Sequence, residues 1–302
     1  MPNLADLVNN PSQCEEAARS LQRSTAIETL KLRGWPGLKQ YGLYFASFWV
    51  YGWLQPQRAG IIKSAYFWLR HIDDVADGDR PLPSGYESKQ QYLQDKKHLA
   101  QALSQPGLQG SASLEEVDIL LVDYFLAAES LGISLADETL SVLETIRFDE
   151  ERSRTRRVPA QAELDDYFNK LDSACINGAL KVAGEPYHGE ATLHDLSWAV
   201  RIWFNLRDFP KDFREGLVNV SAEDIARYGI RLDECRGKLP GVLEHKPLHE
   251  WYQAQLQAGQ RYLQSARRTI HDTPFKALTK LALFTQFVNP ADRTFRRYAA
   301  LL

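Results

Sequence analysis

Residues 66–77 read Tyr-Phe-Trp-Leu-Arg-His-Ile-Asp-Asp-Val-Ala-Asp, an aromatic and apolar run that ends in carboxylates. Its apolar residues recur at three- and four-residue spacing, which is the pattern of one face of an α-helix. Asp73 and Asp77 are four residues apart, so a helix places both carboxylates on one face, roughly 5–6 Å apart at Cβ. Because like charges at this spacing repel each other, the pair favours a bound cation.

Residues 206–212 repeat this arrangement as Leu-Arg-Asp-Phe-Pro-Lys-Asp, at the end of a second helical run. Asp208 and Asp212 are again four residues apart, and no third aspartate pair in the sequence has this spacing. Mg²⁺ prefers hard oxygen ligands and completes its shell with water and substrate phosphates. The two pairs therefore predict a magnesium-dependent site for a phosphorylated substrate.

An arginine accompanies each aspartate pair. Arg70 lies three residues before Asp73, and Arg207 directly precedes Asp208. A guanidinium group binds phosphate oxygens in a bidentate fork, so both arginines are candidates for binding a diphosphate. The alternative is that each arginine only forms a salt bridge with its neighbouring carboxylate.

The rest of the sequence predicts helices and no strands. Start signals at Thr25, Ser88, Ser113 and Thr273 are typical of helix N-caps. Helix formers with apolar residues at helical spacing fill seven segments. These are residues 15–29, 57–75, 89–103, 114–131, 162–182, 193–208 and 249–271.

The composition is that of a globular protein with a sizeable core, since 44% of the residues are hydrophobic and 25% are charged. A net charge of −3 gives no basic excess, which argues against a nucleic-acid partner. The three cysteines are far apart and are typical of reduced thiols in a cytoplasmic protein. Without a long linker or repeat, residues 1–302 are predicted to form a single helical domain, with residues 1–20 at its periphery.

The most apolar stretch, residues 41–54, is shorter than the roughly 18–20 residues that span a bilayer. The N-terminus also lacks the basic and apolar regions of a signal peptide. We therefore expect a buried core helix, of which a lining for a lipid-like substrate is a special case. Peripheral contact of a cytoplasmic protein with a membrane is the lesser alternative.

In the two aspartate motifs the chain resembles the squalene/phytoene synthase family. Residues 66–77 look like that family's tyrosine, arginine and DDxxD signature, and residues 206–212 are similar to its RDxxxD motif. Residues 215–221 and 226–230 resemble the segment that follows, and the spacing between the motifs agrees. The resemblance extends over about residues 40–300.

This resemblance implies an all-α fold of the class I isoprenoid synthase type, a helical bundle with a deep central cavity and the two motifs facing each other across its mouth. It implies two or three Mg²⁺ ions that bind the substrate diphosphate. Arg70, Arg207 and Tyr66 are implied to help bind the same diphosphate. The implied metal ligands and catalytic residues are Asp73, Asp77, Asp208 and Asp212.

The implied activity is that of a prenyltransferase, which ionises an allylic C10–C20 prenyl diphosphate and joins two such substrates head to head. NADPH enters only if the product is squalene. Aromatic rings can stabilise the cation, by about 0.5–2 kcal/mol each. The candidates, each with plain core packing as the alternative, are Tyr44, Phe45, Phe48, Trp49, Trp203 and Phe204.

Three positions near the second motif depart from the family pattern. Members usually carry Gln seven residues and Asn four residues before the first aspartate, where this chain has Arg201 and Phe204. Asn205, on an adjacent face, is a candidate to replace the missing Asn, and Arg201 is a candidate to contact the diphosphate directly. Asn219 stands in place of a tyrosine.

These departures keep two alternatives to head-to-head coupling open. One is a divergent relative that passes a prenyl group to a small non-isoprenoid acceptor, or cyclises it. The other is a non-catalytic scaffold that keeps the fold, which the retention of all four motif aspartates disfavours.

Three further features are interpreted as structural. His71 is one residue past Arg70, on a different helical face from the aspartates, and is expected to be a structural histidine. Pro210 removes a backbone hydrogen bond and is expected to kink its helix. The mixed charges of residues 149–157 are typical of a solvated loop, with arginines at the cavity mouth as the alternative.

Overall fold

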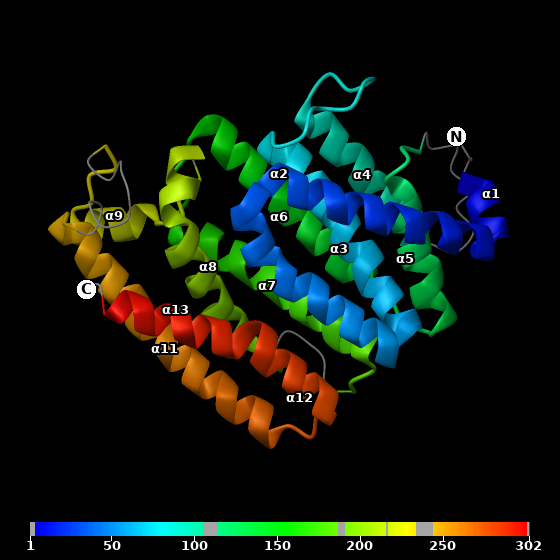
Figure 1. Cartoon of the computed structure of the whole chain (residues 1–302). Helices are drawn as coiled ribbons and strands as arrows, with labels where there is room; N and C mark the ends of the chain where they lie inside the picture. Colours follow the sequence, from blue (N-terminus) through cyan, green and yellow to red (C-terminus); the bar gives the residue numbers. More distant parts are fainter. Residues whose placement is uncertain (1–3, 105–113, 187–190, 216, 234–243, 301) are drawn as a thin grey trace. The chain divides into compact units, whose positions relative to one another are not determined.

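The computed structural model describes residues 4–104, 114–186, 191–215, 217–233, 244–300 and 302, with side chains described outside residues 33–50 and 214–215. All regular structure within these ranges is helical, as Figure 1 shows, so the all-α prediction is confirmed. The chain divides into two compact units, residues 1–147 with 181–184, and residues 148–180 with 185–302. The prediction of a single domain is not tested by this division, since two helices contribute residues to both units.

In the first unit, α3 packs against α2, α4 and α5. On α3, Trp68 and Ile72 are fully buried, and the Trp68 indole donates a hydrogen bond to Asp118 Oδ1 on α5 (3.1 Å). Lys96 of α4 donates to the other oxygen of Asp118 (2.6 Å), so a buried charge pair ties these helices together. The helices are α1 (Leu4–Asn9), α2 (Pro11–Leu54), α3 (Pro56–Asp77), α4 (Lys89–Ser104), α5 (Asp118–Ser130) and the first part of α6 (Ala136–Thr155).

A second buried polar contact joins α2, α3 and α5. Gln22 donates to the Ser64 hydroxyl (2.8 Å), which in turn donates to Asp123 Oδ2 (2.6 Å). Burial raises the pKa of Asp123 to about 6, although the hydrogen bond from Ser64 opposes the rise. The folded state therefore holds the Asp123 proton more tightly than the unfolded chain does. Protonation of Asp123 therefore stabilises the folded state. This stabilisation is complete below about pH 4 and is lost as the pH rises through about 6.

We expect the Asp123→Asn variant to lose this pH dependence, because an asparagine amide does not titrate. At pH 7.5 it removes a buried negative charge, so the free energy of unfolding rises by on the order of 2 kcal/mol over wild type. At pH 4.5 the two proteins should be nearly equal. Urea unfolding at both pH values measures the difference, and an identical change at both would contradict the assigned pKa.

In the second unit, α8 packs against α11 and α13. Gly259 of α11 permits this close approach, since a Cβ atom there would lie 2.6 Å from Phe295 Cζ and 3.0 Å from Ile202 Cγ2. In Figure 1, α11 and α13 run side by side. Besides the end of α6, the elements are α7 (Gln161–Ala183, which ends in the first unit), α8 (His194–Glu215), α9 (Ala222–Tyr228), α11 (Lys246–Asp272), α12 (Ala277–Leu283), the π-helix η1 (Phe284–Val288) and α13 (Asn289–Ala299).

Each of the seven predicted helical segments overlaps a helix of the structure, but their starts were less predictable. The Ser88 cap is confirmed, since its hydroxyl accepts from Gln91 N (3.2 Å). Thr25 is wrong as a start because it lies inside α2, and Thr273 is wrong because it caps the C-terminus of α11. Ser113 lies outside the described residues.

Two expectations from single segments need correction. The solvated loop predicted for residues 149–157 is helical through Thr155, and Arg152 within it is fully buried. Residues 41–54 were expected to form a buried core helix. The end of this stretch is exposed instead, since Trp53 is 85% exposed where α2 stops at Leu54. Pro210 lies inside α8, as expected, and the kink there remains a prediction. Among the described residues, no helix is long and apolar enough to cross a membrane.

Candidate active site

The first motif lies on the last turns of α3, where an arginine bridges two aspartates. Arg70 Nη1 lies 2.8 Å from Asp73 Oδ2, and its Nη2 lies 2.5 Å from Asp74 Oδ1. Side-chain exposure separates the carboxylates: Asp73 is 32% exposed and Asp77 is exposed, while Asp74 is only 1% exposed. The two predicted metal ligands therefore reach solvent, and the middle aspartate does not.

Asp74 is a structural residue that the sequence analysis did not single out. Its Oδ2 lies 3.5 Å from Arg80 Nε, and its backbone carbonyl accepts from Arg80 N (2.9 Å). The chain turns back at Gly78, whose φ of 85° is the left-handed conformation that ends many helices. Asp74 thus holds Arg70 through Oδ1, and it holds Arg80 in the loop after α3 through Oδ2 and its backbone carbonyl. In the sequence, only the four-residue spacing between Arg70 and Asp74 could have indicated this ion pair.

Two neighbours complete the first motif. The half-buried Tyr66 packs edge-on against Phe67, with ring centroids 5.3 Å apart. Burial, with Arg80 and Lys96 nearby, lowers the pKa of His71 to about 4. His71 is therefore neutral near pH 7, and its structural role remains a prediction.

The second motif lies on the last turns of α8. Arg207 forms a two-point contact with Asp208, from Nε to Oδ1 (2.7 Å) and from Nη2 to Oδ2 (2.5 Å). The guanidinium carbon is 4.7 Å from the centre of the Phe204 ring, so Phe204 supports the arginine through a cation–π contact. Asp208 keeps 35% of its side chain exposed.

Four polar residues share one face of α8, at intervals of four, three and four residues. They are Arg201, Asn205, Asp208 and Asp212. Asn205 is 7% exposed, and its buried Oδ1 has no hydrogen-bond donor among the described residues. Asp212 accepts a hydrogen bond from Asn219 Nδ2 (3.3 Å). Arg201 is buried, and its Nε donates to Asp172 Oδ2 on α7 (2.6 Å). Its contact with a diphosphate remains a prediction.

The oxygen atoms on these helices are of the kind that Mg²⁺ binds. Within the described residues, no three side chains of His, Cys, Asp or Glu gather as a metal-binding group, and each motif contributes two carboxylates. Carboxylate oxygens and an amide oxygen without a donor, such as Asn205 Oδ1, are ligands that Mg²⁺ accepts. That the two motifs converge on shared metal ions remains a prediction.

The predicted aromatic residues fall into two groups. Trp203 and Phe204 stack on α8 with ring centroids 4.6 Å apart. The remaining four lie where the structure does not describe side chains, so their role remains a prediction. They are Tyr44, Phe45, Phe48 and Trp49.

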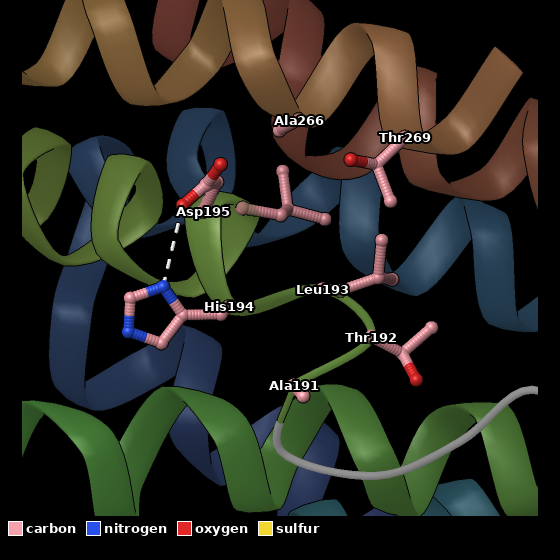
Figure 2. A pocket seen from close by; sticks show the side chains of 8 residues that line it. Ala191, Thr192, Leu193, His194, Asp195, Ala266 and Thr269 are labelled. Carbon is pink, nitrogen blue, oxygen red and sulfur yellow. Dashed lines mark hydrogen bonds and ion pairs between the residues drawn. The ribbon is translucent and has the colours of Figure 1, made fainter. Parts of the chain in front are cut away.

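A separate pocket of about 340 Å³ opens at the start of α8. Figure 2 shows its lining, which includes His194 and Asp195 at the start of α8 and Ala266 and Thr269 of α11; in this view the His194 ring points away from Ala266 and Thr269. His194 Nδ1 lies 3.3 Å from Asp195 Oδ1. None of the predicted site residues lines this pocket, and it is therefore not the candidate site.

An all-α chain with an arginine–aspartate motif on each of two helices has the features of a helical isoprenoid synthase. The family model described as squalene/phytoene synthase matches residues 48–297, which is most of the chain. The chain therefore belongs to the squalene/phytoene synthase family, and the predicted resemblance and fold type are confirmed.

Two similar proteins are both named presqualene diphosphate synthase. The protein from Sinorhizobium fredii is 26% identical over 178 residues, which are 59% of this chain and 58% of the relative. The protein from Rhodopseudomonas palustris is 25% identical over 183 residues, which are 60% of each chain. The chain thus covers about three fifths of the length of these relatives.

Proposed function

We propose that this protein is a Mg²⁺-dependent prenyltransferase that ionises an allylic prenyl diphosphate and releases diphosphate. The observation that carries the proposal is the pair of arginine–aspartate motifs on α3 and α8. In each, the first aspartate keeps about a third of its side chain exposed, 32% for Asp73 and 35% for Asp208. Membership of the squalene/phytoene synthase family supports the same conclusion.

In this proposal the four motif aspartates hold the metal, and Asn205 replaces the asparagine that other members carry one residue earlier. Mg²⁺ held by these residues would supply positive charge where negative charge develops on the departing diphosphate. Arg70 and Arg207 bind phosphate oxygens as well, because each guanidinium is already oriented on a motif carboxylate. Arg70 is held in place from behind by the buried Asp74.

We propose a second prenyl diphosphate as the acceptor, which gives head-to-head coupling of two C10–C20 substrates. The names of both relatives support this choice, since each refers to a presqualene diphosphate. NADPH is required only if the reaction continues to squalene.

A second candidate is transfer of the prenyl group to another acceptor, or its cyclisation. One observation favours it: Arg201 and Asp172 place a buried ion pair beside Phe204, the position where the metal-binding asparagine of the family is missing. A fixed charge pair there alters the surroundings of the second motif. Peripheral membrane contact remains a separate prediction.

Incubation with a single labelled prenyl diphosphate and Mg²⁺ tests both candidates. For head-to-head coupling we expect release of diphosphate and a product that contains two prenyl units by mass spectrometry, without any added acceptor. A product with one prenyl unit, or one that forms only with an added acceptor, would support the second candidate. The matched control is the same incubation with EDTA, which should stop diphosphate release. Substrate that stays intact with Mg²⁺ would refute the enzymatic proposal.

A further inference from the structure

The buried Arg152 connects α6 to the segment that follows the second motif. Its Nη1 donates to Asn219 Oδ1 (3.0 Å) and to the carbonyl of Val218 (3.1 Å). Its Nη2 forms an ion pair with Asp149, and its guanidinium carbon lies 4.8 Å from the centre of the Phe148 ring. All of these residues belong to the second unit.

The charge of Arg152 is neutralised within its own helix. Asp149 accepts from Arg152 through Oδ1 and from the Tyr167 hydroxyl through Oδ2 (2.5 Å). A fully buried arginine is costly unless it is paired and hydrogen-bonded in this way. Asp149 thus supplies the negative charge that pairs with Arg152. The other end of the guanidinium, Nη1, is left to donate hydrogen bonds to Val218 and Asn219 in the segment after α8.

The guanidinium group determines which way the Asn219 amide faces. Arginine has donors and no acceptor, so the oxygen of the Asn219 side chain must face Arg152. The amide nitrogen then faces the other way, where it donates to Asp212 Oδ2 (3.3 Å). Asn219 is only 9% exposed, which limits its freedom to turn. Arg152, Asn219 and Asp212 thus form one directed chain of hydrogen bonds.

We infer that Arg152 and Asn219 are positioning residues, which hold the carboxylate of Asp212 in the orientation that binds metal. The inference rests on the proposed function, because it takes Asp212 as a metal ligand. Partners behind a ligating carboxylate fix its rotamer, and their loss commonly weakens metal binding by about 10–100-fold. The 3.3 Å contact to Asp212 is long, so we expect an effect of about tenfold, at the lower end of this range.

Direct metal binding tests the inference without reference to turnover. Mn²⁺, a paramagnetic substitute for Mg²⁺, is titrated into the full-length protein with inorganic pyrophosphate, and free Mn²⁺ is measured by electron paramagnetic resonance. Asn219→Ala should weaken Mn²⁺ binding by about tenfold, with helical content close to wild type. Asn169→Ala is the matched control, because Asn169 also accepts a side-chain hydrogen bond, from Trp198, but lies outside both motifs. This control should bind Mn²⁺ like wild type.

A double-mutant cycle separates positioning from a merely structural role. If Arg152 acts through Asn219, then Arg152→Met combined with Asn219→Ala should bind Mn²⁺ no more weakly than the weaker of the two single variants. Independent, additive losses would show that Arg152 does not act through Asn219. If Arg152→Met does not fold, Asn219→Ala alone decides.

The failure of this inference can be told from the failure of the proposed function. Wild-type binding that is lost in Asp212→Ala but unchanged in Asn219→Ala would overturn the inference alone. Absence of Mn²⁺–pyrophosphate binding by the wild-type protein would refute the proposed metal site, and the positioning role with it.

Discussion

Replacing Asp208 with alanine should reduce diphosphate release by at least about a hundredfold, and Asp73→Ala should have the same effect. Each change removes an oxygen ligand at the point where negative charge develops on the leaving group. Asp208→Ala also removes the carboxylate that contacts Arg207, whereas in Asp73→Ala the buried Asp74 still pairs with Arg70. Release of diphosphate from a prenyl diphosphate, measured with a coupled phosphate assay at saturating Mg²⁺, gives the size of the loss.

The fold should survive both substitutions, because both carboxylates are partly exposed at the ends of their helices. Circular dichroism should therefore report unchanged helical content. The matched control is Asp166→Ala, which removes an exposed aspartate whose partner is Lys170 on the same helix. Such a surface pair contributes little to stability, and its loss should leave diphosphate release intact. Wild-type turnover in either motif variant would remove the mechanism.

Replacing Asp172 with alanine should destabilise the fold by about 3–5 kcal/mol. Its Oδ2 accepts from Arg201 Nε at 2.6 Å, and the side chains are only 7% and 10% exposed. Burial raises the pKa of Asp172, while the charge of Arg201 opposes the rise. Alanine leaves the Arg201 guanidinium buried without its anion, which costs more than the pair contributes. Equilibrium unfolding in urea measures the change.

The double variant Asp172→Leu with Arg201→Met is the control for this prediction. Replacing a whole buried pair with apolar residues of similar volume is often nearly neutral, so most of the lost stability should return. A loss below about 1 kcal/mol in Asp172→Ala alone would show that the pair is accessible to water. The double variant also tests whether Arg201 contributes to diphosphate binding, since it removes that guanidinium in a stable background.

The candidate site was predictable where its signal is local. The pairs Asp73–Asp77 and Asp208–Asp212, with an arginine near each, are patterns within one or two helical turns. Asp74 lies within the first pattern, yet its burial could not be predicted, because it depends on Arg80 and the turn at Gly78. The start signal at Thr25 failed for a related reason. Its local pattern is that of a cap, but the helix begins earlier, at Pro11.

The largest difference concerns the charged run of residues 149–157. By sequence it is a solvated loop, because nearby charges of both signs can satisfy one another in water. In the structure Arg152 is fully buried, since partners 66 and 67 residues away supply the carbonyl of Val218 and the amide of Asn219. Arg201 is likewise buried because a partner distant in the sequence, Asp172, 29 residues away, accepts its hydrogen bond. No local pattern indicates such partners.

The sequence by itself determined the all-α class, the approximate positions of the main helices and the two acidic motifs, because helical periodicity and four-residue spacing are properties of neighbouring residues. Only the tertiary structure decided which charges are buried and what supports the motif carboxylates. That decision depends on packing between distant segments, which bring a donor such as Asn219 Nδ2 to Asp212 and exclude water from Arg152.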